Sequence, residues 1–335
     1  MPCRILTITY LGLMASALLF PSVLQSAETR TCWAGHTGEC GATAPQVLDL
    51  AVPRSTAAKS EMSDVIDAPL EVRLERQFLD DFLGSSPDHD IWRHHYNHGR
   101  YDEFRGRTLQ ANKEQQIYVD PGFSGTGDTP LGLNPFDIRD GVLGITGRRA
   151  RSDAMPYLDG FAYTSGLLSS QNTFEQTYGY FEARIKVPVG QGLWSAFWLK
   201  THHAHTPKGL PAWPPEIDVM EFIGTRTDRY YTTAHWDVMP DNKKSGSAVL
   251  NVNPGADFNA YGVLWTPDQT VFYFNRQPVK TIETKPNHNV PMFMVLNLAL
   301  GGKWPGNVSD SALPARLEVD WVAAYEISPN QKVRQ

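Results

Sequence analysis

Long apolar runs are scarce in this sequence, and the only clear one lies at its start. Residues 5–19 are mainly apolar, follow Arg4 and precede the small residues Ser26 and Ala27. This order is typical of a secretory signal peptide, and the run is too short to be a convincing membrane span. We therefore expect a signal over residues 1–27, a secreted or periplasmic protein, and no stable membrane insertion after cleavage. An uncleaved anchor is the alternative.

Cysteine and concentrated positive charge are also scarce. The 335 residues include three cysteines, of which Cys3 belongs to the expected signal, and the formal net charge is -6. Phosphate binding requires basic patches and no basic stripe is present, so nucleic acid is not an expected partner. Cys32 and Cys40 would most simply form a disulfide in an exported chain. Zinc binding with His36 is a weaker alternative, because no fourth ligand is evident.

The composition changes along the chain. Residues 28–70 contain Ala, Ser, Thr and Pro without a sustained period, so we expect a tail or linker there. From Phe78 onwards, short strand-like runs are broken by Gly, Pro, Asn and Asp, and no long amphipathic helix or repeat is visible. We predict an all-β domain over residues 71–330. Its expected architecture is a jelly-roll β-sandwich of two antiparallel sheets, one of them concave and forming a cleft.

An acidic segment within one strand-like run carries the most chemical information. Glu216, Asp218 and Glu221 stand there among apolar residues. Alternate side chains of a regular strand share a face, so Glu221 would point into the core at a high cost. A β-bulge near Val219 and Met220 would place all three acids on one face, with one of these two residues in the core. Crowded carboxyls acquire separated pKa values, which suit general acid and nucleophile roles; a solvated acidic edge or a calcium site is the alternative.

Aromatic residues surround the acidic segment. Trp194 and Trp198 lie in the most aromatic strand-like run, residues 193–199, and Trp213 closely precedes the acids. Sugar rings offer an apolar C–H face to aromatic side chains and hydroxyls to polar groups, so tryptophans beside carboxylates suit a carbohydrate site. Trp194 and Trp198 share one face of a strand, so either both line a cleft or both are buried in the core.

Several segments together resemble glycoside hydrolase family 16. The resemblance begins with residues 178–186, 192–199 and 216–221, the last of which contains the three acids. The other matching segments are residues 112–118, 134–136, 297–306 and 319–322, of which 297–306 resembles the laminarinase type. Residues 213–216 are similar to bacterial members that cut exopolysaccharides. The resemblance covers roughly residues 78–327, and the family carries the bulged form of the acidic motif.

The resemblance implies a mechanism for the acids. Glu216 matches the nucleophile of a retaining glycosidase, Glu221 matches its acid/base, and Asp218 matches the helper that tunes the nucleophile. Glu216 would attack the anomeric carbon while Glu221 protonates the departing oxygen, and water would then release the sugar. This chemistry requires no metal and no organic cofactor.

The resemblance also suggests further site residues. The candidates for substrate binding are His235 and the residues Asn112, Trp194, Trp198, Trp213, Asn297 and Trp304. His235 would contact the sugar or steady Glu221, and a histidine packed beside Trp236 is the alternative. In related enzymes the aspartate at the position of Asp320 can bind a structural calcium on the convex side; an aspartate bonded to backbone amides is the alternative.

These observations favour a secreted, endo-acting, retaining glycoside hydrolase with a polysaccharide as its partner. The expected substrates are β-1,3-glucan, mixed β-1,3/1,4-glucan or a bacterial exopolysaccharide. A transglycosylase on the same scaffold is one alternative, and a non-catalytic carbohydrate-binding β-sandwich is another. The intact set of three acids argues against the binding module, which has no use for mutually repelling carboxylates. No feature of the sequence indicates an oligomeric state.

Overall fold

The computed structural model describes residues 31–33, 65–67, 72–96, 104–201, 215–236 and 243–328. The expected signal, Cys40 with the expected disulfide, most of the expected tail and Trp213 lie outside these residues. The described part consists mainly of strands, with four short 3-10 helices: η1 (Arg105–Arg107), η2 (Gln110–Asn112), η3 (Met155–Tyr157) and η4 (Asp310–Ala312). Among the described helices, none has the length and apolar character needed to span a bilayer.

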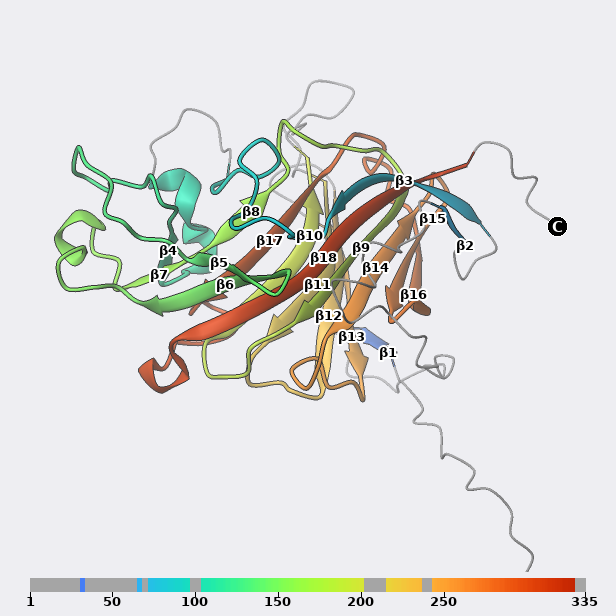
Figure 1. The fold of residues 1–335 in the computed structure, drawn as a ribbon. Coiled ribbons are helices and arrows are strands. Elements are labelled where there is room, and N and C mark those ends of the chain that lie inside the picture. The colour runs from blue at the N-terminus through green and yellow to red at the C-terminus, as the bar shows by residue number, and fades with distance from the viewer. Residues whose placement is uncertain are drawn as a thin grey trace, which may run out of the picture.

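The strands form two sheets, which Figure 1 shows as two layers. The first sheet has the strand order β1 (Thr31–Trp33), β13 (Lys243–Leu250), β12 (Arg229–Trp236), β11 (Glu216–Ile223), β10 (Leu193–Lys200), β17 (Phe293–Leu300) and β8 (Leu167–Ser169). The second has the order β16 (Gln277–Glu283), β15 (Gln269–Phe274), β14 (Asn259–Trp265), β9 (Gly179–Lys186), β18 (Ala315–Ile327), β6 (Val142–Arg149), β7 (Tyr163–Ser165) and β4 (Gln116–Tyr118).

Three further strands join the second sheet beside this path. They are β2 (Val65–Asp67), β3 (Arg73–Asp80) and β5 (Phe136–Arg139), which pair with β3, β18 and β6 respectively. The described pairings are antiparallel apart from β4 with β7, which run parallel at one end of the sheet. The all-β sandwich of two sheets predicted from the sequence is confirmed.

The apolar core lies between the two sheets, and strand alternation decides which side chains enter it. Leu193, Phe197 and Leu199 of β10 are fully buried there and meet residues such as Phe181 and Ile185 of β9. Each large apolar side chain buried in this way contributes roughly 1.5–3 kcal/mol to folding. The same alternation turns Trp194, Ala196, Trp198 and Lys200 of β10 to the outer face of the first sheet.

The loop after β17 is fixed against the start of β10. Gly192 precedes β10 with a φ of 79°, and a Cβ atom there would lie 2.3 Å from Cα of Val308. The amide of Gly301 donates a hydrogen bond to the carbonyl of Gly192 over 2.7 Å. Only glycine adopts this backbone conformation without strain and permits the close approach. The contact places the loop that contains Trp304 beside the outer face of the first sheet.

Candidate active site

A β-bulge in β11 sets the direction of the acidic side chains. The pairing of β11 with β10 skips Val219. Against β12, the two residues Val219 and Met220 occupy the space of one residue between Thr233 and Tyr231, so Val219 is the extra residue. The sequence predicted a bulge at this point, and its position is confirmed. Val219 and Met220 both pack in the core, whereas the prediction placed only one of them there. The changed phase keeps Glu221 beside Asp218 rather than in the apolar core, which Phe222 enters instead.

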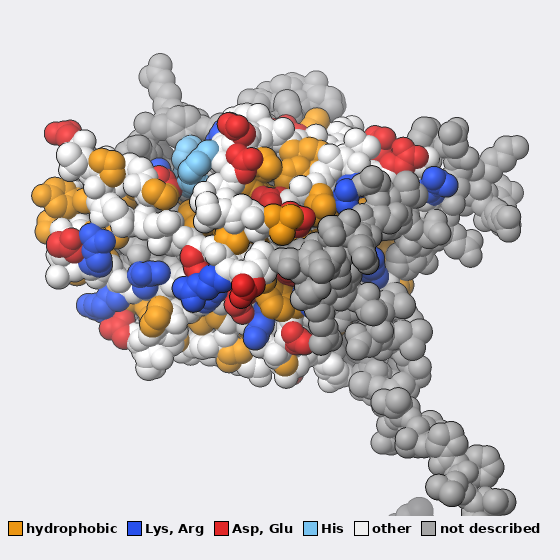
Figure 2. Space-filling model, viewed as in Figure 1, with side chains coloured by type: hydrophobic (Ala, Val, Ile, Leu, Met, Phe, Trp, Pro, Cys, Tyr) orange, Lys and Arg blue, Asp and Glu red, His pale blue; other side chains and the backbone are white. Residues whose placement is uncertain are grey.

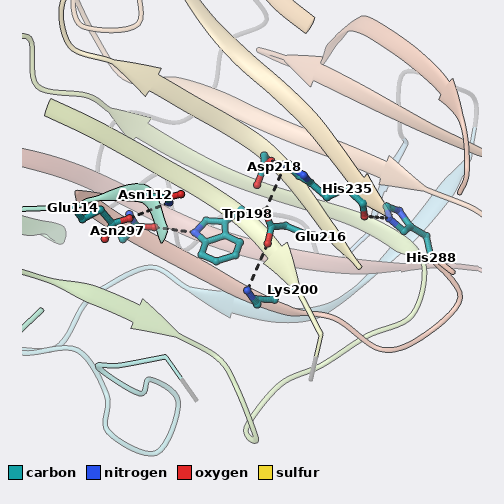
Figure 3. A network of polar contacts seen from close by, with 9 residues as sticks. All are labelled: Asn112, Glu114, Trp198, Lys200, Glu216, Asp218, His235, His288 and Asn297. Atoms are coloured by element: carbon teal, nitrogen blue, oxygen red, sulfur yellow. Dashed lines mark hydrogen bonds and ion pairs between the residues drawn. The ribbon is translucent and has the colours of Figure 1, made fainter. Parts of the chain in front are cut away.

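Two cationic side chains flank Glu216 on the outer face of the sheet. Lys200 of β10 and His235 of β12 are its direct cross-strand neighbours. Nζ of Lys200 lies 3.6 Å from Oε2 of Glu216, and Nε2 of His235 lies 3.7 Å from Oε1 (Figure 3). Nε2 of His235 also lies 3.1 Å from Oδ2 of Asp218. Each oxygen of Glu216 therefore has its own cationic neighbour.

The surroundings of the two glutamic acids differ. Burial and the charge of Asp218 raise the pKa of Glu216, while the charges of Lys200 and His235 oppose that rise. Burial and then the charges of Asp218 and Glu216 raise the pKa of Glu221 well above its ordinary value, and His235 opposes this only in part. Because Lys200 lies against Glu216, the geometry favours the charged form of Glu216 and the protonated form of Glu221.

His235 is protonated at neutral pH. Burial alone would lower its pKa, but the hydrogen bond to Asp218 and the charges of Asp218, Glu216 and Glu221 raise that pKa to about 9. The backbone carbonyl of His235 accepts a hydrogen bond of 2.8 Å from Nε2 of His288 (Figure 3). Burial lowers the pKa of His288 to about 4, so this second ring is neutral and holds the end of β12 in place.

The same group of atoms has a spacing that would suit a cation. One oxygen of Glu216, one of Asp218 and a ring nitrogen of His235 lie within 4.8 Å of one another. A histidine must be neutral to bind a metal, however, and the pKa of His235 is about 9. A metal ion at this position would therefore have to displace a proton that the neighbouring acids hold on His235.

Trp198 lies on the same face as the acids, opposite Asp218. Its indole N–H donates a hydrogen bond of 2.8 Å to Oδ1 of Asn297, whose Nδ2 donates to the hydroxyl of Tyr118 over 3.1 Å. Trp198 and Asn297 are each only 5% exposed. Asn297 was predicted to bind substrate, and in the structure its amide is occupied in orienting Trp198.

A second group of aromatic side chains lies beyond Glu221 along the strand, on the side away from Trp198. The rings of Trp194 and Trp304 are 5.5 Å apart and nearly perpendicular, and Trp304 lies 4.7 Å from the ring of Tyr231. Tyr231 is the cross-strand neighbour of Glu221. The guanidinium of Arg226 donates to the hydroxyl of Tyr231 over 2.5 Å, which fixes the edge of this aromatic cluster.

Two predicted residues lie away from the acids. Asn112 donates to Oε1 of the buried Glu114 over 3.3 Å, and its carbonyl accepts from the amide of Lys303, so it supports the loop that carries Trp304. Asp320 is 2% exposed in the second sheet. Its carboxylate forms a buried ion pair with Arg184. A guanidinium at this position repels a dication, so the calcium prediction for Asp320 gains no support and stays a prediction.

Three site residues were not predicted from the sequence. Lys200 follows Trp198 by two positions, so strand alternation alone could have placed it on the same face. Thr233 precedes His235 by two positions, and its hydroxyl donates to Oε2 of Glu221 over 3.4 Å. His288 lies in a loop, and no local pattern connects it with the acids.

A hollow of about 650 Å³ lies elsewhere, over β5, β6 and the start of β18. Figure 2 shows acidic and basic side chains interspersed over the position of β5 and β6 in Figure 1. Asp137 contacts both Arg139 and Arg316, and Arg149 pairs with Asp310 over 2.8 Å. The arginines of this hollow are thus largely neutralised by their own neighbours, and no acid of β11 lines it.

Comparisons with known proteins place these observations in a family. The model described as Glycosyl hydrolases family 16 matches residues 134–323. Endo-1,3-1,4-beta-glycanase ExsH of Rhizobium meliloti (strain 1021) is 34% identical over 232 residues, which are 68% of this chain and 47% of that protein. Endo-1,3-1,4-beta-glycanase EglC of the same strain is 38% identical over 224 residues, 67% of this chain and 45% of that protein. The chain thus spans about half the length of these curated relatives.

A solved structure agrees in fold. A variant of SCLam, described as a non-specific endo-beta-1,3(4)-glucanase from family GH16, aligns with a TM-score of 0.61 and 26% identity. The alignment covers 78% of this chain and 98% of that one. SCLam was co-crystallised with 1,3-beta-D-cellotriosyl-glucose and holds an oligosaccharide at its active site.

Proposed function

The chain belongs to glycosyl hydrolases family 16, and we propose that it is an exported, endo-acting, retaining hydrolase of a β-glucan or a related bacterial polysaccharide. The observation that carries this proposal is the different setting of Glu216 and Glu221 on one bulged strand. Lys200 and His235 flank the first, whereas burial and two neighbouring carboxylates act on the second. One charged and one protonated carboxyl on the same face is the arrangement that double displacement requires.

In the first half of the reaction, Glu216 attacks the anomeric carbon of the bound sugar. A bond forms between its carboxylate oxygen and that carbon, while the bond to the bridging glycosidic oxygen breaks. Glu221 transfers its proton to the departing oxygen, so the shortened chain leaves as a neutral alcohol. Asp218 and His235, whose side chains lie 3.1 Å apart, act on the pKa values of both acids.

In the second half, water replaces the departed chain. Glu221, now a carboxylate, takes a proton from the water as its oxygen bonds to the anomeric carbon. The bond to Glu216 breaks with its electron pair returning to the carboxylate, so the product keeps the original anomeric configuration. No step of this reaction needs a metal or an organic cofactor.

The aromatic side chains beside the acids support a carbohydrate substrate. Trp198 lies on one side of the acidic strand, and the cluster of Trp194, Trp304 and Tyr231 lies towards Glu221. Such side chains pack against the apolar faces of sugar rings. The names of ExsH, EglC and SCLam point to β-1,3 and mixed β-1,3/1,4 linkages, and we carry that linkage class over to this chain as a proposal.

The test is hydrolysis of a panel of polymers by the purified protein. Laminarin, mixed-linkage β-glucan, an acidic bacterial exopolysaccharide and agarose would be compared by the release of reducing ends and by product size. We expect an early fall in chain length of at least one β-glucan or exopolysaccharide, and products that retain the β-anomer when observed by NMR within minutes. The matched control is Glu216→Gln, which keeps the side-chain shape and removes the nucleophilic charge.

Each other outcome would point to a different activity or mechanism. Polymer binding without new reducing ends would mean a carbohydrate-binding sandwich and would reject the proposal. Release of the inverted anomer would reject the retaining mechanism. Longer products that accumulate with an added oligosaccharide acceptor would identify a transglycosylase.

A further inference from the structure

Lys200 is placed to serve one carboxylate of the site. It is the last residue of β10 and lies directly opposite Glu216, the first residue of β11. Its ammonium is 3.6 Å from Oε2 of Glu216, and the two side chains are only 12% and 14% exposed. A contact between opposite charges that are mostly removed from water is far less screened than a surface ion pair.

The other cation of the site is engaged elsewhere. His235 lies closer to Asp218, at 3.1 Å, than to Glu216, at 3.7 Å. With Glu221 protonated, two carboxylates face two cations, so each carboxylate has a cation of its own. Removal of Lys200 would leave the carboxylate of Glu216 without the positive charge that lies closest to it.

Packing also limits the freedom of Lys200. Its ammonium lies 5.2 Å from the centre of the Trp198 ring, a distance at which a cation is attracted by an aromatic face. Asn297 in turn fixes the indole of Trp198. Figure 3 shows Lys200 and Trp198 beside Glu216 on the neighbouring strand. The long lysine side chain is therefore held in a direction that points at the nucleophile.

We propose that Lys200 is a positioning residue that orients the carboxylate of Glu216 for attack and compensates its charge in both halves of the reaction. The inference rests on the proposed function. In the glycosyl ester, Glu216 carries no charge and Lys200 faces its carbonyl oxygen. When the ester bond breaks, the electron pair returns to Glu216 beside the ammonium, so Lys200 stabilises the departing carboxylate without moving a proton.

Several other groups lie close enough to Glu216 to affect its protonation. Asp218 lies on its own strand, His235 on β12, and Glu221 beyond the bulge. Tyr96, from the segment before η1, lies near enough for the charge of Glu216 to affect it. Lys200 contributes the cation on the β10 side, so its removal shifts the balance towards the protonated form of Glu216.

The experiment compares Lys200→Met and Lys200→Arg with the wild type over a range of about pH 4 to pH 9. Lys186→Met is the matched control, because Lys186 is also the last residue of a strand but lies in the other sheet. We expect Lys200→Met to lower kcat about tenfold or more with little change in KM. Its acid limb of kcat/KM should move to higher pH by about one unit. Lys200→Arg should recover most of the lost kcat and most of the shift in the acid limb. Lys186→Met should match the wild type.

The inference is overturned by an acid limb that stays in place in Lys200→Met, by a loss confined to KM, or by no recovery in Lys200→Arg. Thermal unfolding and polymer binding of each variant, measured in parallel, identify a change that comes only from misfolding. If the wild type itself cleaves no polymer, the proposed function fails instead. An active wild type with an equally active Lys200→Met variant would reject the role of Lys200 alone.

Discussion

Nε2 of His235 and Oδ2 of Asp218 lie 3.1 Å apart across the strands β12 and β11. This contact places a protonated imidazole among three carboxyl groups, because the hydrogen bond and the surrounding charges outweigh the effect of burial on the pKa of His235. The positive charge serves two purposes at once. It reduces the repulsion between the acids, which stabilises the fold, and it opposes the rise in pKa of both Glu216 and Glu221.

The first prediction concerns stability against pH. The pKa of His235 rises from 6.5 to about 9 on folding, so its contribution is fully present below about pH 6.5 and is lost as the pH rises through about 9. The contribution amounts to at most about 3 kcal/mol. Urea unfolding at several pH values should show the free energy of unfolding falling over this window in the wild type and far less in His235→Gln.

His94 provides a control of opposite sign. Burial lowers its pKa to about 4, so its contribution is present above about pH 6.5 and is lost as the pH falls through about 4. His94→Gln should therefore alter the acid side of the stability curve and leave the alkaline side unchanged. An identical alkaline slope in His235→Gln and the wild type would show that His235 is not the titrating group.

The second prediction separates the roles of the two glutamic acids. Glu216→Gln should lose nearly all turnover on every substrate, because no bond to the anomeric carbon can form. Glu221→Gln should lose about 10²–10⁴-fold on polymers, where a poor leaving group needs protonation. With an aryl glycoside that leaves unaided, Glu221→Gln should still form the glycosyl ester in the first turnover.

Rescue by azide is an independent test of which glutamic acid is the nucleophile and which is the acid/base. Added azide should restore turnover to Glu221→Gln and give a β-glycosyl azide, since it attacks the ester without needing a base. In Glu216→Gln, azide should instead give the α-glycosyl azide by direct attack. Rescue products with the two configurations exchanged would mean that the roles of Glu216 and Glu221 are exchanged.

Strand phase explains why the shared face of the three acids could be predicted from the sequence. Leu193, Phe197 and Leu199 alternate with the residues of the outer face, so the face of Trp198 follows from spacing alone. The bulge was predictable because a regular strand would have placed Glu221 among core residues, and Val219 is the extra residue that prevents this. Local periodicity and the cost of a buried charge were sufficient for both inferences.

The contacts that depend on register between distant segments could not be predicted in this way. Asn297 orients Trp198 only because β17 pairs with β10, although the two residues are 99 positions apart in the chain. Asp320 is similar, since its partner Arg184 comes from β9 and the pairing skips a residue between Val319 and Trp321. A single sequence shows residue types at these positions but not which strands meet.

The third prediction concerns the support of Trp198. Asn297→Ala removes the acceptor of the buried indole N–H, so it should cost about 1–3 kcal/mol in the free energy of unfolding. Turnover should also fall, because Trp198 would no longer be fixed beside Lys200 and the acids. Urea unfolding and polymer hydrolysis measure the two effects.

A double-mutant cycle isolates the hydrogen bond itself. Trp198→Phe removes the indole donor, so Asn297→Ala should cost less in that background than in the wild type. A coupling of at least about 0.5 kcal/mol between the two changes is expected for residues in contact. Simple additivity would show that Asn297 stabilises the fold through Tyr118 and not through Trp198.

The last prediction tests the phase of β11 directly, through deletion of both Val219 and Met220 and through the substitution Val219→Ala. The double deletion makes Glu221 the residue after Asp218, so alternation must either turn Glu221 into the core or force β11 to unfold locally. Both outcomes remove Glu221 from the outer face, and we expect complete loss of polymer cleavage together with a lower melting temperature. Val219→Ala keeps the extra residue and removes only two methyl groups from the core, at a cost of about 1–3 kcal/mol. It should remain active at temperatures where it is folded, with the pH profile of the wild type, because the phase of the strand is unchanged. A folded double-deletion variant with ordinary activity would mean that strand phase does not set the direction of Glu221. An inactive but folded Val219→Ala would show that the side chain of Val219 matters more than the number of residues between Asp218 and Glu221.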